Sequence, residues 1–397
     1  MKMFKKLIFA ALLLPLSGTM HAGDIDAAVS EVLGNDPVLI AERERLHALE
    51  HEIHAENTLA GPELGMSYRW GLDGVGNKWG VDVSQSFDWP GLYRARSRQA
   101  SMQAGAFATL YRAKEVQQAL VVRQAIYTLL AARAEMKELT IWEENLQELI
   151  EIYDRQLKRG EATILEVNKL HLEIFQARSL IADARNRLGN AEADLQALNG
   201  GNLPAALPQE MTYEELRPYK YYEEQLLRSD PEVLAARRLF DIAQQDYKVV
   251  ALKAAPGFKL GYVYENEAGE HFHGFSFGIT LPSWNNRAAK RASEAKLIET
   301  MAESDVVSLQ RTAQVRAQYT SADKARKLIE DGRGLFGADA DYLSVLRKAL
   351  DGGKINILEF IRLENEYLQA ALEFNNLCLR YNLDAASLNR ANYAVND

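Results

Sequence analysis

The chain has 397 residues, of which 25% are charged, a formal net charge of −9 and a single cysteine. An acidic chain without basic runs argues against a nucleic-acid partner. Cys378 excludes an internal disulfide, and its apolar surroundings predict a buried thiol. The length alone would permit two or three ordinary domains.

The first 22 residues are typical of a secretory signal peptide. A basic region with Lys2, Lys5 and Lys6 precedes the apolar run 7–16, and Ala22 is a small residue at the expected cleavage point. No cysteine lies near this point, so a lipoprotein is not expected. An uncleaved anchor is the alternative, but the apolar run is short for a membrane span, and no later stretch reaches about 18 uninterrupted apolar residues.

The rest of the chain consists of two similar halves. Gly160 returns as Gly353 after 193 residues, Asp36-Pro37 returns as Asp230-Pro231 after 194, and the segment 62–68 returns as 256–262. The nearly constant offset predicts a tandem duplication of a unit of roughly 190 residues. We assign 23–203 to the first repeat, the proline-containing segment 204–222 to a linker, and 223–397 to the second repeat.

Long helices are expected in both repeats. Each Asp-Pro pair has the form of an N-cap followed by proline at the first helical position. No proline lies in 91–203 or 283–397, so nothing there must break a helix. The stretch 93–157 would be about 95 Å long as one helix, a length that belongs in a rod or a tube. A heptad of apolar residues predicts supercoiled helices further on; it comprises Leu170, Ile174, Ala177, Ile181, Ala184, Leu188, Ala191, Leu195 and Leu198, and then Leu363, Tyr367, Ala370, Phe374, Leu377 and Tyr381.

Between prolines 62 and 90, and again between 256 and 282, the hydrophobic period changes to two. Each repeat therefore predicts one β-hairpin with strands of about 10 residues, which have an aromatic-rich face and a small or polar face. That length and alternation match a transmembrane β-strand. A soluble hairpin packed on a core is the alternative. The apolar rows are Leu64, Met66, Tyr68, Trp70; Trp79, Val81, Val83, Phe87, Trp89; Phe258, Leu260, Tyr262, Tyr264; and Phe275, Phe277, Ile279, Leu281, with Gln85 the break in the second.

Four strands cannot close a barrel in lipid, where free edges leave backbone groups unpaired. Two chains would supply eight strands, whose interior side chains just fill. Three chains would supply twelve, with room for a water-filled lumen. The strands therefore favour a trimer with a pore.

The duplicated order of leader, Asp-Pro helix, hairpin, very long helix, glycine-containing turn and heptad helix resembles the TolC family of outer-membrane efflux channels. The resemblance covers essentially the whole chain after the leader. It is carried by the Asp-Pro pairs, by the segments Gly61-Pro-Glu-Leu-Gly-Met-Ser-Tyr68 and Phe87-Asp-Trp-Pro90, and by the Gly-x₄-Leu-Glu segments at Gly160 and Gly353. The compact hairpin turns and Gly61-Pro-Glu-Leu look most similar to the heavy-metal cation branch that serves pumps of the RND type.

This resemblance implies a mainly α protein with β-strands. The duplicated helix–hairpin–long helix–helix unit would form, as a homotrimer, a 12-stranded β-barrel in the outer membrane, continued by a periplasmic α-helical barrel. Its partners would be a periplasmic adaptor (membrane fusion) protein, an inner-membrane RND-type pump and outer-membrane lipid. The channel would conduct and do no chemistry.

The resemblance also implies roles for individual residues. Gly160, Glu161, Gly353 and Lys354 would lie at the adaptor-docking tip. Glu166 and Glu359 match positions of acidic aperture residues, where up to six carboxylates would attract cations. Solvated helix charges are the plainer interpretation, and Arg362 stands where some members have a second acid. Some members lock the closed tip with a Tyr and an Arg, where this chain has Leu350 and Ile355. On the polar strand faces, Arg69, Asp82 and Asp88 are expected to line the lumen.

Other functions receive less support. His47, His51 and His54 share a helical face and could ligate a cation, but solvated positions are the plainer interpretation, and no metal or cofactor is expected. No catalytic motif is present, so an enzyme is not expected. The main competitor is an exported periplasmic coiled-coil structural or adaptor protein, which would explain the heptads and leader but not the hairpins. The cargo could be metal ions, drugs or a polypeptide.

Overall fold

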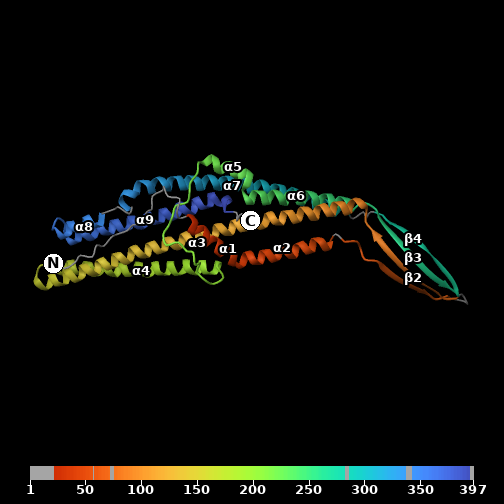
Figure 1. Cartoon of the computed structure of the whole chain (residues 1–397), viewed down its shortest axis with the longest axis horizontal. Coiled ribbons are helices and arrows are strands. Elements are labelled where there is room, and N and C mark those ends of the chain that lie inside the picture. Colours follow the sequence, from red (N-terminus) through yellow and green to blue (C-terminus); the bar gives the residue numbers. More distant parts are fainter. Residues whose placement is uncertain (1–21, 57, 72–75, 282–285, 337–341, 394–397) are drawn as a thin grey trace. The chain divides into compact units, whose positions relative to one another are not determined.

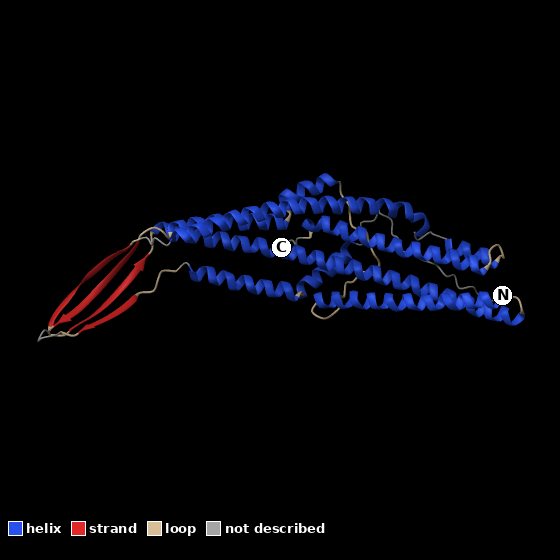
Figure 2. Ribbon diagram, turned by 180° about the vertical axis from the view of Figure 1, so that it is seen from behind, coloured by secondary structure: helices blue, strands red, loops and turns tan. Residues whose placement is uncertain are grey.

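The computed structural model describes residues 22–56, 58–71, 76–281, 286–336 and 342–393. The chain is mainly helical with one sheet (Figures 1 and 2). Its elements are α1 (Ala22–Asn35), α2 (Pro37–Glu56), β1 (Glu63–Arg69), β2 (Lys78–Phe87), α3 (Pro90–Arg159), α4 (Ile164–Leu198), α5 (Tyr219–Ser229), α6 (Pro231–Leu252), β3 (Gly257–Glu267), β4 (Glu270–Thr280), α7 (Asn286–Phe336), α8 (Tyr342–Asp351), α9 (Ile357–Asn389) and a 3₁₀ turn at Arg390–Asn392.

The Asp-Pro pairs start helices, as the sequence predicts. The Asp230 carboxylate caps α6 by accepting from the backbone N–H groups of Glu232 and Val233 at 3.1 and 3.2 Å, and a proline stands at the first helical position. In the first repeat the Asp36 carboxylate accepts from the N–H of Val38 at 2.8 Å. The two pairs therefore have the same local role.

The long helix of the first repeat is confirmed. α3 has 70 residues and a length of about 105 Å at 1.5 Å per residue. The second proline-free run differs, because it contains α7, α8 and α9 rather than one long helix and its return. Gly332 and Gly334 lie in the last turns of α7, where glycine lowers helix stability.

The chain packs as two units that do not coincide with the repeats. Unit 1 comprises residues 1–40, 114–226 and 312–397, and unit 2 comprises 41–113 and 227–311. Both repeats contribute to both units. The predicted linker 204–222 belongs to unit 1, and its last residues begin α5.

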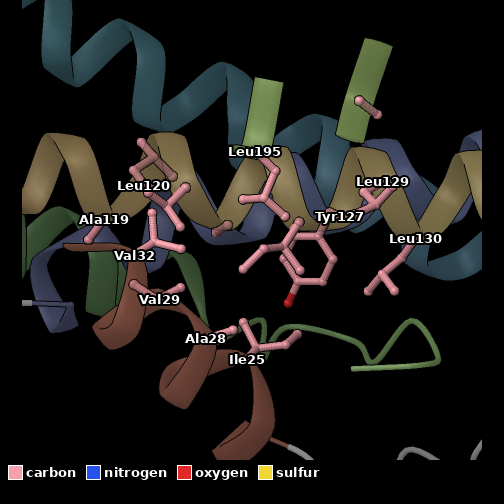
Figure 3. Packing of buried hydrophobic residues seen from close by; sticks show 14 residues of the cluster. Ile25, Ala28, Val29, Val32, Ala119, Leu120, Tyr127, Leu129, Leu130 and Leu195 are labelled. Atoms are coloured by element: carbon pink, nitrogen blue, oxygen red, sulfur yellow. The ribbon is translucent and has the colours of Figure 1, made fainter. Parts of the chain in front are cut away.

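Unit 1 contains two hydrophobic clusters. The heptad residues Leu170, Ala177, Ile181 and Ala184 of α4 are buried against α3, α8 and α9, as the periodicity predicts. The other cluster joins α1 to α3, α4 and the end of α9. Figure 3 shows its α1 residues, Ile25, Ala28, Val29 and Val32, beside Ala119 and Leu120 of α3. Cys378 is buried too, with its Sγ 3.2 Å from the Tyr213 hydroxyl.

A buried polar network fixes the linker to the same region of unit 1. The Arg123 guanidinium donates to the Glu214 carboxylate at 2.8 Å and also pairs with Asp26. The Tyr127 hydroxyl donates to the same carboxylate at 2.9 Å, and the Tyr393 ring lies 4.2 Å from the guanidinium carbon. Residues from α1, α3, the linker and the C-terminal segment therefore meet around the Arg123 guanidinium.

Unit 2 contains one antiparallel sheet with the order β1-β2-β3-β4 (Figure 2). The two predicted hairpins are present, and their inner strands also pair with each other, so that Phe87 lies opposite Phe258 and Lys78 opposite Glu267. Within the described residues, β1 and β4 each have a strand partner on one side only. The strands have 7, 10, 11 and 11 residues, close to the predicted length.

Candidate channel surfaces

The register of the sheet gathers the predicted apolar rows on one face. Residues directly opposite each other in antiparallel strands point to the same side. One row across the sheet is Leu64, Val83, Tyr262 and Phe275, and the next is Met66, Val81, Tyr264 and His273. Large side chains on this face are uncovered, with Phe275 93% and Met66 82% exposed. An apolar face of this extent marks a membrane or protein contact.

Gln85 is the polar residue that interrupts this face, and its amide is satisfied locally. Its Nε2 donates to the carbonyl oxygen of Ala60 at 2.5 Å and to that of Ser86 at 3.2 Å. The side chain therefore folds back on the chain that enters β1. This contact removes much of the cost of a polar group on an apolar surface.

The opposite face carries small and charged residues. Gly65 lies opposite Asp82, and a Cβ at this glycine would be 2.3 Å from the Asp82 carboxylate, so the glycine makes room for the acid. Two cross-strand ion-pair groups flank it. Lys259 pairs with Glu63 at 2.6 Å, and Lys78 pairs with Glu265 and Glu267 at 2.9 and 3.2 Å.

Of the three residues expected on the polar face, two are there. Arg69 lies opposite Lys78, and Asp82 lies opposite Gly65. Asp88 follows the end of β2, where its carboxylate pairs with Arg96 of α3 at 2.7 Å and its N–H donates to the Tyr93 hydroxyl. It therefore fixes the junction between sheet and helix.

The two glycine turns of unit 1 have the same geometry. Gly160 and Gly353 have φ values of +73° and +64°, the left-handed region that glycine adopts without strain. In each turn the glycine N–H and the next N–H bond back to carbonyls of the preceding helix, with Glu161 donating to Gln156 and Lys354 to Ala349, both at 2.9 Å. These are Schellman motifs.

Glu166 and Glu359 occupy the same helical position, three residues after the N-caps Thr163 and Asn356. The Glu166 carboxylate accepts from the Thr163 N–H at 2.7 Å and from its hydroxyl at 2.8 Å, which completes a capping box. Glu359 instead accepts from Arg362 at 2.5 Å, and this hydrogen bond lowers the pKa of Glu359. Both carboxylates thus have a local partner.

Two buried acids of unit 1 were not expected from the sequence. Glu364 of α9 is 3% exposed, and Glu173 of α4 is 1% exposed. Glu173 pairs with Lys169 and accepts from Asn365 at 2.9 Å, whereas one carboxylate oxygen of Glu364 has no hydrogen-bond partner among the described residues. Burial raises the pKa of Glu364 to about 7. The spacing of Glu173 three residues after Leu170, beside the heptad stripe, could have indicated its burial.

In the described part of the chain, the histidines do not form a metal site. His47 and His51 are exposed on α2, and the side chain of His54 lies outside the described residues. Nδ1 of His271 lies 2.6 Å from the Tyr264 hydroxyl. Across the described residues, no three His, Cys, Asp or Glu side chains lie close enough together to hold a metal ion.

No described helix is long and apolar enough to cross a membrane.

The order of elements, two helix–hairpin–helix repeats whose hairpins join in one four-stranded sheet, matches that of TolC-family channel structures. Residues 28–201 match the sequence profile of the family described as "Outer membrane efflux protein". This match lies within the first repeat, and it supports an outer-membrane component of efflux systems. No curated protein matches the sequence.

Solved structures share the fold over nearly the whole chain. A membrane protein from Pseudomonas aeruginosa superposes with a TM-score of 0.76 and 17% identity, covering 93% of this chain and 90% of its own. The open state of the MtrE outer membrane channel of Neisseria gonorrhoeae gives 0.74 and 16%, with coverages of 94% and 89%. The CmeC outer membrane channel of Campylobacter jejuni gives 0.70 and 15%, with coverages of 93% and 84%.

Proposed function

We propose that the chain is the outer-membrane exit channel of a tripartite efflux system and works as a homotrimer. The single observation that carries this proposal is the sheet of unit 2. Its aromatic face is uncovered, and its polar face carries cross-strand ion pairs. Among the described residues, the edge strands β1 and β4 each pair with one strand only. A soluble hairpin would bury its apolar face, which is the opposite arrangement.

The size of the sheet suits a bilayer. Ten residues of β2 span about 33 Å along the strand, or about 25 Å when tilted by about 40°, which is the height of the apolar band of a membrane barrel. The edges β1 and β4 would leave unpaired backbone groups in lipid. Copies of the chain can satisfy them by pairing β4 of one with β1 of the next, and three copies give a closed ring of 12 strands with a wet interior.

The same proposal assigns the remaining parts. Residues 1–22 would be the leader that directs export, and the repeats 23–203 and 223–397 with their linker would form one subunit of the channel. The helices would continue the barrel through the periplasm. The turns at Gly160-Glu161 and Gly353-Lys354 would meet the adaptor, and an RND-type pump would supply the cargo. Residues Arg69 and Asp82 would line the lumen, with Asp88 at its base.

The trimer and its location can be tested together. We expect the full chain, expressed with its leader, in outer-membrane fractions as a trimer that dissociates on heating in detergent. Replacing Tyr262 and Phe275 by Asp would place charges on the apolar face and should prevent insertion. The control variant Ser276→Asp, on the polar face of β4 directly opposite Gly261, should still insert. Release of the unaltered chain by osmotic shock as a soluble monomer would contradict the channel and favour the periplasmic rod.

The aperture requires a separate test, because Arg362 offsets Glu359. Single-channel recording in planar bilayers should show lower cation selectivity for the double variant Glu166→Gln, Glu359→Gln. The Arg362→Gln variant should change selectivity in the opposite direction, since it frees two carboxylates, Glu359 and Glu366. Equal selectivity in all three proteins would remove both acids from the aperture and leave them as capping residues.

We propose a heavy-metal cation as the cargo class, on the likeness of Gly61-Pro-Glu-Leu and the compact hairpin turns to that branch of the family. Growth of a deletion strain on graded metal salts and antibiotics tests this assignment. Sensitivity to antibiotics alone would assign the channel to drug efflux without affecting the proposed trimer.

A further inference from the structure

Two helices of unit 2 begin with positive charge directly after the sheet. Arg94 and Arg98 lie in the first three turns of α3, and Arg287, Lys290 and Arg291 lie in the first two turns of α7. All five side chains are exposed. No acid occurs in α3 before Glu115 or in α7 before Glu294.

The pattern is duplicated. Arg94 and Arg287 are 193 residues apart, and so are Arg98 and Arg291, which is the offset of the glycine turns. Each repeat therefore places the same pair of arginines, four residues apart on one side of a helix, after the second strand of its hairpin. The arrangement occurs twice at a corresponding place in the fold.

Helix electrostatics do not account for these charges. A helix N-terminus favours negative side chains, and α4, α6 and α9 follow this preference with Glu166, Glu232 and Glu359 in their first turns. The starts of α3 and α7 do the reverse. Among the described residues, none of the five basic side chains forms an ion pair; Lys290 lies 5.8 Å from the Tyr247 ring centroid. Neighbouring Arg96 differs, because it pairs with Asp88.

Contacts within unit 2 hold both helix starts against one helix. The side-chain amide of Gln245 in α6 donates to the carbonyl of Ala95 in α3 at 3.0 Å. The Asn286 amide at the start of α7 donates to the carbonyl of Val250 in α6 at 3.3 Å. The basic residues of both repeats therefore flank the second half of α6, which itself leads into β3.

The basic residues also adjoin the apolar face of the sheet. Trp89 lies between β2 and α3, is 43% exposed, and its ring centroid is 6.1 Å from that of Phe258 at the base of the face. Side chains on a helix lean toward its N-terminus, so Arg94 and Arg98 point back toward the sheet. Arg94 lies about 7.5 Å beyond Trp89 along the chain at 1.5 Å per residue, within the depth of a headgroup layer of roughly 5 to 8 Å.

We infer that Arg94, Arg98, Arg287, Lys290 and Arg291 bind the headgroups of anionic phospholipids in the leaflet that faces the helices. This inference rests on the proposed membrane location of the sheet and goes beyond it by assigning a lipid class to defined residues. The phosphate and the net negative charge of the headgroup supply the acceptors that this basic belt lacks among the described residues. Anionic lipid would also offset the unfavourable charge at the two helix starts.

Tryptophan quenching by brominated lipids tests the inference. The full-length trimer is reconstituted in phosphatidylcholine vesicles that contain either brominated phosphatidylcholine or brominated phosphatidylglycerol. We expect phosphatidylglycerol to bind about fivefold more strongly, the ratio that corresponds to about 1 kcal/mol for one arginine near an anionic surface. Added salt should reduce this preference.

The test variant replaces Arg94, Arg98, Arg287 and Arg291 by Gln and should bind both lipids about equally. The control replaces four exposed basic residues of unit 1, Arg185, Lys220, Arg316 and Lys324, by Gln and should keep the preference, although its net charge changes equally. An unaltered preference in the test variant would overturn the inference. So would equal binding of both lipids by the unaltered trimer, which would point to an acidic protein partner for the belt. Failure of the unaltered chain to insert into either vesicle would contradict the proposed channel itself.

Discussion

The two repeats have the same plan but stabilise it with different side chains. In the first repeat the Asp36 cap has a buried oxygen with no hydrogen-bond partner among the described residues. In the second repeat the corresponding Asp230 pairs with Arg311, and both side chains are 6% exposed. The position 193 residues before Arg311 is Gln118. The two repeats therefore share the geometry of the cap but not the side chain that pairs with the capping carboxylate.

The helices that follow the glycine turns differ in the same way. α4 buries Glu173 while its counterpart in α9, Glu366, is exposed, and α9 buries Glu364 while its counterpart in α4, His171, is exposed. Because α4 and α9 pack in one unit with different neighbours, equivalent positions meet different surroundings. Duplication therefore fixes the course of the backbone more firmly than it fixes which polar groups become buried.

The largest effect on stability is expected from Arg311→Gln. This change gives the partner of the Asp230 cap the residue type found at the equivalent position of the first repeat, Gln118. It leaves the buried Asp230 carboxylate without its ion pair, and the loss of one partner of such a pair typically costs about 3 to 5 kcal/mol. Urea denaturation should show a lower midpoint. Arg316→Gln, at an exposed position in the same helix, should leave the midpoint unchanged. Equal midpoints for all three proteins would mean that the two caps are energetically equivalent.

Glu364→Gln should raise the free energy of unfolding at alkaline pH and remove the part of its pH dependence that Glu364 causes. The folded state holds the Glu364 proton up to about pH 7, whereas the unfolded carboxyl releases it near 4.5, so the free energy of unfolding falls as pH rises through this interval. By pH 8 the loss is about 3 kcal/mol. Denaturation at pH 5 and pH 8 should differ less for Glu364→Gln than for the exposed control Glu373→Gln. An unchanged difference would mean that Glu364 titrates normally.

The glycine turns should respond alike. Gly160→Ala and Gly353→Ala each place a Cβ where nothing lies within 4 Å, so backbone strain at positive φ is the cost, about 1 kcal/mol. Both thermal midpoints should fall by similar amounts. Gly189→Ala in the middle of α4 also meets nothing within 4 Å and should raise the midpoint instead. A drop in only one of the two turn variants would show that the repeats differ at these turns.

The smallest expected effect is a difference in stability between variants of Glu166 and Glu359, the glutamates three residues after the N-caps of α4 and α9. Glu166→Ala removes one half of the capping box and should cost about 0.5 kcal/mol, whereas Glu359→Ala removes only an exposed pair with Arg362. Thermal melting at low and high salt distinguishes them, because salt weakens the exposed pair but not the backbone cap. Equal salt sensitivity of the two variants would count against this difference.

Much of this fold could be predicted from local rules. The Asp-Pro caps, the glycine turns, the heptad core of α4 and the alternating strands all depend on residues close in sequence, so their patterns are visible without the structure. The pairing of β2 with β3 could not be predicted in this way. It joins residues about 180 positions apart, and the alternation within a strand does not indicate which other strand it pairs with. Nor was the division between α7 and α8 predicted, since no proline marks it.

The candidate site residues show the same division between features set by local sequence and features set by long-range packing. The turn glycines and the N3 position of both glutamates follow from the duplication, and the polar-face residues Arg69 and Asp82 follow from the alternation. The engagement of Glu166 with Thr163 and of Glu359 with Arg362 depends on rotamers. The burial of Glu364 depends on how three helices meet, which no single periodicity encodes. Asp88 was assigned to a strand face because the end of β2 lies just before it.

The packing of α1 has a consequence for biogenesis. Its side chains share a core with Ala386 of α9, so α1 completes its contacts only after α9, far later in the chain, has been made. A chain crossing a membrane N-terminus first would have to keep this amphipathic stretch from aggregating throughout its transit. Deletion of the final turns of α9 should therefore remove part of the surface on which α1 packs.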